Sequence, residues 1–164
     1  LVEHQPEWHR LADEERDRLR SVFGEEVEKI EHVGSTAIEG LPAKPVIDLL
    51  AIIDDPAPKS EYVTRLEPEG YELRENDPVP DRLFFSKGPA GARTHYLSIA
   101  ERGSDCHREQ IAFREYLRKH PDAAAEYARR KRELAGKHGD DRETYTERKS
   151  AFVQRILDRV ETER

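Results

Sequence analysis

The stretch PVIDLLAII, residues 45–53, constrains the fold most, because it is a continuous apolar run broken only by Asp48. The run is far shorter than a membrane span and is typical of a strand that is covered on both faces. An ionised carboxylate inside it is costly unless it is paired, hydrogen-bonded or bound to a metal. The sequence therefore predicts an interior strand that carries one acid with a specific partner.

A turn pattern stands ahead of this strand. Gly34 permits a sharp turn after the strand expected in VEKIEHVG, and Ser35 and Thr36 are good N-cap residues for a short helix. A helix start offers backbone N–H groups to a phosphate, and a hairpin-like return would bring Asp48 alongside as a ligand for Mg²⁺. The same residues allow a purely structural interpretation, in which Ser35 only caps a helix and Asp48 pairs with Lys44.

The rest of the chain predicts an α+β domain. Helical spacing of apolar residues indicates helices over 7–23, ended by a glycine, and over 58–69. Further strands are expected in YELRE, RLFFSK and RTHYLSIAE, and the turn GPAG joins the last two. From residue 104 the pattern is helical, in DCHREQIAFREYLRKH, DAAAEYARRKRELAGKHG and DRETYTERKSAFVQRILDRVE. We expect one domain over 1–164: a mixed sheet of about five strands with flanking helices over about 1–101, and a C-terminal helical set over about 102–164.

Charge and composition narrow the partners. The net charge is −7, to which residues 1–100 contribute −9 and residues 101–164 contribute +2. This balance makes nucleic acid an unlikely partner and leaves only the C-terminal part to attract phosphate, although ordinary solvated helix faces give the same balance. Cys106 is the single cysteine, so no internal disulfide can form. With no apolar leader in the N-terminal residues, we expect a soluble, cytoplasmic protein without a membrane partner.

Three ordered blocks resemble the GrpB-like family, a branch of the nucleotidyltransferase superfamily. The first is HVGSTAIEGLPAKPVID, which follows the family pattern His-x-Gly-Ser-Thr-Ser-x-Pro-Gly-Leu-x-Ala-Lys-Pro-x-Ile-Asp. The second, RLFFSKG, is similar to the family's Arg-x-Phe-Phe-x-Lys segment. The third, FREYLRKHPDAAAEYARRK, resembles a Phe-Arg-Asp-Tyr-Leu-Arg-x-His-Pro helix followed by Tyr-x-x-x-Lys. The resemblance implies a nucleotidyltransferase-like mixed β-sheet with flanking helices.

The resemblance also implies site roles. In that superfamily a Gly-Ser turn grips the nucleotide phosphates, and carboxylates on the following strand hold two Mg²⁺ ions for in-line transfer. By this resemblance, Gly34 and Ser35, with Thr36 beside them, would bind phosphate. Asp48 would bind the metal and take part in catalysis. Some family members are fused to dephospho-coenzyme A kinase, which adds coenzyme-A-type molecules to the ligands considered.

The chain departs from a complete active site of this kind. A second acid two residues after Asp48 would face the same side of the strand, but that position is Leu50. In the segment resembling the family's Thr-His-His-Leu-His, His95 is kept, while Tyr96 and Ser98 replace two histidines. One carboxylate cannot build the standard two-metal site without further ligands.

Four other residues in the N-terminal part are candidates. His32 and His95 would serve in proton transfer or metal binding if their strands were neighbours, whereas the alternative is that each hydrogen-bonds within the sheet. Lys44 and Arg82 suit contacts with an anionic substrate, and surface salt bridges are the competing interpretation.

The C-terminal helices carry four more candidates. Tyr127 and Lys131 are four residues apart and share a helix face, and Arg114 and Tyr116 precede them. Aromatic and basic groups together can stack on a base and neutralise phosphate. More often such tyrosines pack in a core and such lysines are solvated.

Two functional hypotheses follow. In the first, the protein binds a nucleoside triphosphate with Mg²⁺ and transfers a nucleotidyl or phosphoryl group to a small acceptor that the sequence does not identify. In the second, the same fold is a non-catalytic binding module for a nucleotide or coenzyme-A-type ligand, which agrees with the missing second acid.

Overall fold

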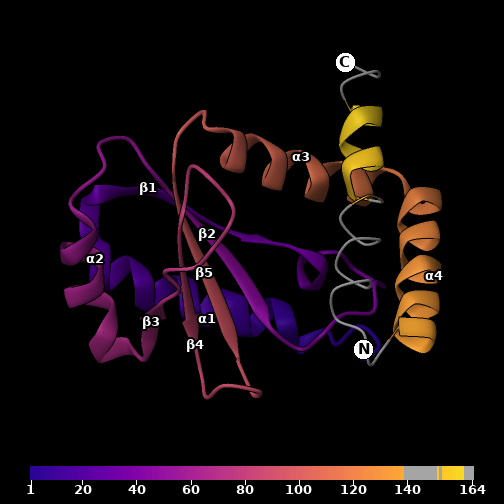
Figure 1. Ribbon diagram of the computed structural model, residues 1–164, viewed down its shortest axis with the longest axis horizontal. Coiled ribbons are helices and arrows are strands. Elements are labelled where there is room, and N and C mark those ends of the chain that lie inside the picture. Colours follow the sequence, from indigo (N-terminus) through magenta and orange to yellow (C-terminus); the bar gives the residue numbers. More distant parts are fainter. Residues whose placement is uncertain (139–150, 152, 161–164) are drawn as a thin grey trace.

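One five-stranded mixed sheet forms the centre of the computed structural model, which describes residues 1–138, 151 and 153–160 (Figure 1). Its strands are β1 (Val27–Val33), β2 (Ile47–Ile53), β3 (Tyr71–Leu73), β4 (Leu83–Lys87) and β5 (His95–Glu101). The order across the sheet is β1-β2-β5-β4-β3. Only β2 and β5 run parallel, and the other neighbouring pairs are antiparallel. The prediction of an α+β domain with a mixed sheet of this size is confirmed.

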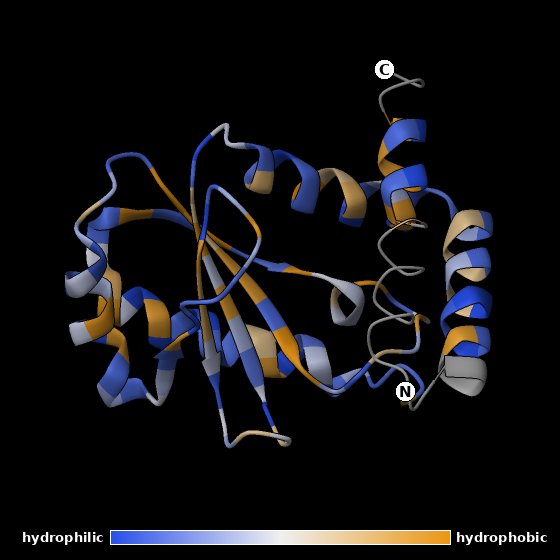
Figure 2. Ribbon diagram, viewed as in Figure 1, coloured by the Kyte–Doolittle hydropathy of each residue, from blue (hydrophilic) through white to orange (hydrophobic). Residues whose placement is uncertain are grey.

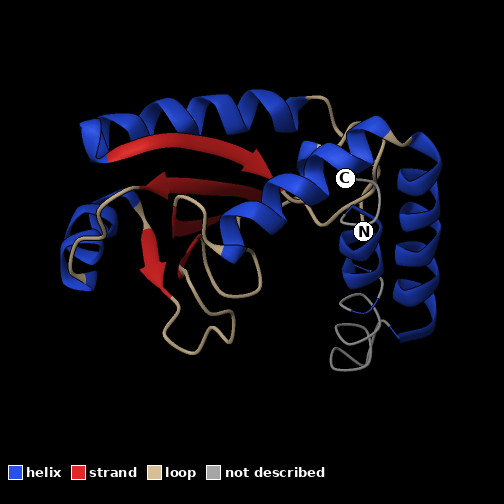
Figure 3. Cartoon of the chain, turned by 90° about the horizontal axis from the view of Figure 1, so that it is seen from above, coloured by secondary structure: helices blue, strands red, loops and turns tan. Residues whose placement is uncertain are grey.

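Helices cover both faces of this sheet. They are α1 (Glu7–Phe23), α2 (Lys59–Leu66), α3 (Asp105–Lys119), α4 (Pro121–His138) and a last helix over 153–160. Helix α1 covers one face of the sheet and α3 covers the other, whereas α4 stands beyond the edge at which β2 starts (Figures 1 and 3). The expected third C-terminal helix agrees with the structure over 153–160, and its first part lies outside the described residues.

Local sequence signals explain several helix ends. Gly24, with a φ of 60°, ends α1 as its C-cap. The hydroxyl of Ser104 accepts a hydrogen bond from the backbone N–H of His107 at 3.3 Å and so caps α3. Helix α4 begins at Pro121, whose missing N–H costs nothing in a first turn. Within the described residues, no helix combines the length and apolar character needed to cross a membrane.

Strand β2 is buried on both faces, as its apolar run predicts. Ile47, Leu49, Ala51 and Ile53 belong to the main core, which also contains the buried face of α1. Leu50 and Ile52 lie on the other face and pack with Cys106 and Ile111 of α3. Figure 2 shows the hydrophobic residues concentrated along the inner strands and on the sides of helices that face them.

A buried ionic contact attaches α3 to the edge strand β1. Arg114, only 8% exposed, donates from Nη1 to Glu31 Oε2 at 2.5 Å and to the backbone oxygen of His32 at 3.0 Å. Its remaining nitrogens contact Glu115 at 2.8–3.0 Å. A buried guanidinium must have such partners, so Arg114 is held in a packing role between helix and sheet.

A row of tilted and edge-on histidine rings joins the N-terminal segment to α1 and β1. The rings of His4 and His9 are 5.4 Å apart, and those of His9 and His32 are 5.6 Å apart. His32 is buried, and its Nε2 lies 2.9 Å from Thr36 Oγ1. Burial lowers the pKa of His32 to about 3, and the neighbouring positive groups act in the same direction. His32 is therefore neutral at ordinary pH.

The Arg114 contact predicts a large loss of stability on truncation. We expect Arg114→Met to lower the free energy of unfolding by about 2 kcal/mol, because Glu31 would lose its buried guanidinium partner and keep only the exposed Lys29. The matched control is Arg108→Met on the same helix, whose ion pair with Asp105 is exposed and should be worth less than about 1 kcal/mol. Urea denaturation measures both variants, and equal losses would contradict a structural role for the buried pair.

The depressed pKa of His32 predicts acid sensitivity. In the unfolded chain the His32 imidazole takes up a proton near pH 6.5, whereas in the folded chain it does so only near pH 3. The contribution of His32 to stability is therefore complete above pH 6.5 and is lost as the pH falls toward 3. The slope from this group approaches about 1.4 kcal/mol per pH unit. Urea titrations between pH 7 and 5 should show a shallower slope for His32→Gln than for wild type. Identical slopes would mean that His32 is not held neutral.

Candidate functional site

The turn after β1 and the start of β2 form a close corner. Val33 at the end of β1 pairs with Asp48 on β2. Gly34 follows with a φ of 75°, and a Cβ at this position would lie 2.6 Å from Asp48 Oδ2. Only glycine satisfies both the backbone conformation and the space, so the Gly-Ser turn and the aspartate thirteen to fourteen residues away are one structural unit.

The turn itself differs from the expected helix start. Residues Ser35–Ala37 make a single turn of 3-10 helix with Gly34 at the N-cap, and no side chain caps it. The N-cap prediction for Ser35 and Thr36 is therefore wrong, because Ser35 is already inside the turn. A three-residue turn has only a small dipole, so the positive charge for a phosphate has to come from side chains.

Lys131 of α4 brings such a charge to the corner. It is 3% exposed, and its Nζ donates to Ser35 Oγ and to the backbone oxygen of Pro42, both at 2.9 Å. The ammonium also lies 5.3 Å from the centroid of the Tyr127 ring. These contacts offset the cost of burying a cation, and they also fix the position of the ammonium.

A small pocket of about 100 Å³ lies at this corner. Five residues predicted from the sequence line it together: Ser35, Thr36, Lys44, Asp48 and Lys131. Tyr96 also lines the pocket, although the sequence interpretation treated it only as a lost histidine. Its place follows from the parallel pairing of β5 with β2, which sets Tyr96 directly opposite Asp48. That register is a long-range property with no local signal.

The position where a second metal-binding acid would stand is not acidic. Leu50 shares the face of Asp48 on β2, and Ser98 is its partner on β5. Among the described residues, no group of three or more His, Cys, Asp or Glu side chains could hold a metal ion. These donors do not fit two resident metals. One Mg²⁺ fits only if the ligand's phosphate oxygens join Asp48, an arrangement that is common for this ion.

His95 lies on the opposite face of the sheet from Asp48. It pairs with Ile47, whose side chain faces α1, and its Nε2 lies 3.9 Å from Glu15 Oε2 on that helix. His32 also faces α1, through His9, but β2 separates β1 from β5. The two histidines were expected to converge only if their strands were neighbours, and these strands are not. The described contacts also link neither histidine to Asp48.

A buried polar cluster surrounds His95. The carboxylate of Glu15 accepts hydrogen bonds from the Tyr71 hydroxyl at 2.6 Å and from Lys87 Nζ at 2.9 Å. Burial would raise the pKa of Glu15, but these bonds outweigh it and lower the pKa below its ordinary value. Burial lowers the pKa of His95, with Glu15 acting against it. The cluster thus keeps Glu15 ionised and ties α1 to β3, β4 and β5.

Arg82 lies on the same face of the sheet as Asp48, but its guanidinium already has hydrogen-bond partners. Its Nε and Nη2 donate to the two carboxylate oxygens of Asp77 at 2.7 Å each, and its Nη1 donates to Ser98 Oγ at 3.3 Å. Its guanidinium lies 4.2 Å from the centroid of the Phe84 ring. The Phe84 ring is 5.1 Å from that of Tyr96, so an aromatic pair separates Arg82 from the pocket.

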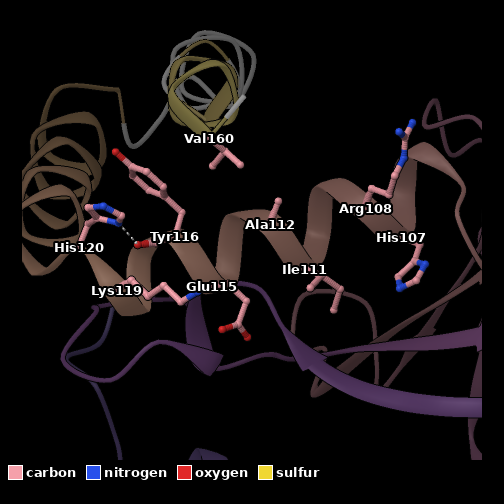
Figure 4. Close-up of a pocket in the computed structure, with 9 residues that line it drawn as sticks. All are labelled: His107, Arg108, Ile111, Ala112, Glu115, Tyr116, Lys119, His120 and Val160. Atoms are coloured by element: carbon pink, nitrogen blue, oxygen red, sulfur yellow. Dashed lines mark hydrogen bonds between the residues drawn. The ribbon is translucent and has the colours of Figure 1, made fainter. Parts of the chain in front are cut away.

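The remaining candidates from the C-terminal helices are elsewhere. Tyr116 lines a separate pocket of about 390 Å³ on α3, which Val160 closes from the last helix (Figure 4). The Tyr116 ring stacks on His120 with centroids 4.1 Å apart. Tyr127 packs edge-on against Phe113 in the core at 5.4 Å. Of the four candidates in α3 and α4, only Lys131 lines the pocket of Asp48.

Sequence comparison finds relatives over nearly the whole chain. UPF0157 protein BH1888 of Halalkalibacterium halodurans is 39% identical over 98% of this chain and 81% of its own length. UPF0157 protein YqkA of Bacillus subtilis is 34% identical over 94% of this chain, which covers only 45% of YqkA. This chain thus spans about half the length of one relative and most of the other.

Solved structures support the same relationship. The crystal structure of GrpB from Enterococcus faecalis matches with a TM-score of 0.84 and 34% identity, covering 97% of this chain and 95% of that one. A Cid1 poly(U) polymerase structure with MgGTP bound matches with a TM-score of 0.54 and 15% identity, covering 82% of this chain and 44% of that one. The second likeness shows the fold alone, and that fold is nucleotidyltransferase-like, as expected.

The family model described as GrpB protein matches residues 1–159. The three sequence blocks, the full-length relatives and the GrpB crystal structure agree with this match. The chain therefore belongs to the GrpB family.

Proposed function

We propose that this protein binds a nucleoside triphosphate by its phosphates at the Ser35–Asp48 pocket and transfers a nucleotidyl or phosphoryl group to a small acceptor. The observation that carries the proposal is the corner itself. The backbone of Gly34 lies against the carboxylate of Asp48, and the Lys131 ammonium is bonded to Ser35 in the same pocket. Such a pair of opposite charges suits a phosphate group together with its counter-ion.

Several residues that line the pocket have a role in this proposal. Ser35 and Lys131 would hold phosphate oxygens, Lys44 at the exposed rim would attract the anionic ligand, and Asp48 would share one Mg²⁺ with the phosphates. When bound, that ion would neutralise charge that develops on the transferred group. Arg82 and His95 receive no direct contact with the phosphates in this proposal, because their described partners lie outside the pocket.

A non-catalytic binding module is the second candidate. Leu50 favours it, since it occupies the position where a second acid would face the same side of β2 as Asp48. Under this candidate, a nucleotide or a coenzyme-A-type ligand binds by its phosphates and is not converted. Turnover separates the two candidates, and ligand binding is common to both.

Ligand-induced stabilisation tests the proposed function. A nucleoside triphosphate at a hundred times its Kd should stabilise the fold by about 2.7 kcal/mol, or several degrees in Tm. We expect a larger shift with Mg²⁺ than with EDTA, and Asp48→Asn should remove the Mg²⁺-dependent part. The control Asp54→Asn changes an exposed acid just after the same strand and should leave the shift intact. If no nucleoside triphosphate shifts the Tm with or without Mg²⁺, the proposal is wrong.

The close approach at Gly34 gives a second test. Gly34→Ala should destabilise the fold by more than the roughly 1–2 kcal/mol that a positive φ costs, because its Cβ would also strike the Asp48 carboxylate. Gly91→Ala is the matched control, since its φ of 84° is similar and no atom lies within 4 Å of the added Cβ. Urea denaturation gives the difference, and equal losses would show that the corner is not tightly packed.

A further inference from the structure

The charge of the Asp48 pocket is unusual for a site that depends on metal ions. Of the side chains that line it, Lys44 and Lys131 are cationic and only Asp48 is anionic. A two-metal site needs several carboxylates to hold its ions, and here Leu50 stands where the second would be, with Ser98 opposite it on β5. With no metal bound, these three charged side chains sum to a positive charge, which already favours an anion.

The contact between Lys131 and Ser35 orients a second donor. An ammonium group can only donate, so Ser35 Oγ must be the acceptor in their 2.9 Å hydrogen bond. The hydroxyl hydrogen of Ser35 is then directed to another acceptor, next to a charge that is already fixed. Because Pro42 and Tyr127 also hold the ammonium, it does not need to reorganise when an anion arrives.

The pocket volume limits what can enter. About 100 Å³ accommodates a phosphate group and is well below the roughly 300–1,000 Å³ of pockets that enclose whole small molecules. A nucleoside would therefore remain outside the pocket, and only the phosphate end of the ligand would be enclosed.

We propose that this pocket binds the terminal phosphate of its ligand as a metal-free anion, with the Lys131 ammonium supplying the charge that a second metal ion supplies in a two-metal site. This inference deepens the proposed function and rests on it. Mg²⁺ at Asp48 then serves the transfer step and adds to affinity, but the phosphate is held without it.

Isothermal titration with inorganic tripolyphosphate in EDTA tests the inference, because the probe carries no base or sugar. Wild type should bind, and Lys131→Met should weaken binding by at least about tenfold through the lost charge-assisted bond. Arg129→Met removes the same charge from an exposed position of α4 and should bind like wild type. Asp48→Asn should bind at least as well as wild type in EDTA, because it removes the only carboxylate in the pocket.

A second variant covers the case in which Lys131→Met does not fold. Ser35→Ala keeps every charge and removes only the oriented hydroxyl, so it should fold and bind tripolyphosphate more weakly than wild type. Equal affinities for Lys131→Met and Arg129→Met would overturn the inference. Binding of a nucleoside triphosphate with Mg²⁺, but of no tripolyphosphate in EDTA, would overturn it and leave the proposed function standing. If neither ligand binds under either condition, both are wrong.

Discussion

The packing of the Gly34 backbone against the Asp48 carboxylate is the constraint on which the candidate site depends. It sets the register at the end of β1, because Val33 must pair with Asp48 for the turn to close. It also places the carboxylate of this otherwise apolar strand against the backbone of the turn. The turn that follows then presents Ser35 to α4, so one steric contact positions the walls of the pocket.

Local patterns predicted what depends on neighbouring residues, and long-range packing decided the rest. The continuous apolar run predicted an interior β2, and the spacing of Gly34 and Asp48 predicted their approach. By contrast, the face occupied by His95 depends on the pairing of β5 with β2, which no local pattern reveals. Lys131 was a candidate because it shares a helix face with Tyr127, but its bond to Ser35 depends on how α4 docks.

The family relationship and the geometry describe a nucleotidyltransferase-like fold with altered electrostatics. The corner of Gly34, Ser35 and Asp48 forms one wall of a pocket that, with Leu50 two residues after Asp48, is lined by one carboxylate. A site with fewer carboxylates binds free metal ions more weakly, and it also repels a phosphate less. Lys131, whose ammonium is held by Ser35 Oγ and the Pro42 oxygen, adds a positive charge to the same pocket.

The bond between Lys131 and Ser35 joins residues that are 96 positions apart in the sequence. The pocket is therefore complete only after α4 has docked against the corner, one of the longest loop closures that folding of this chain requires. Any opening that lifts α4 from the sheet dismantles the pocket at the same time. An occupied pocket would thus slow hydrogen exchange along α4 as well as around Ser35, so that occupancy could be read from a helix far from β2 in the sequence.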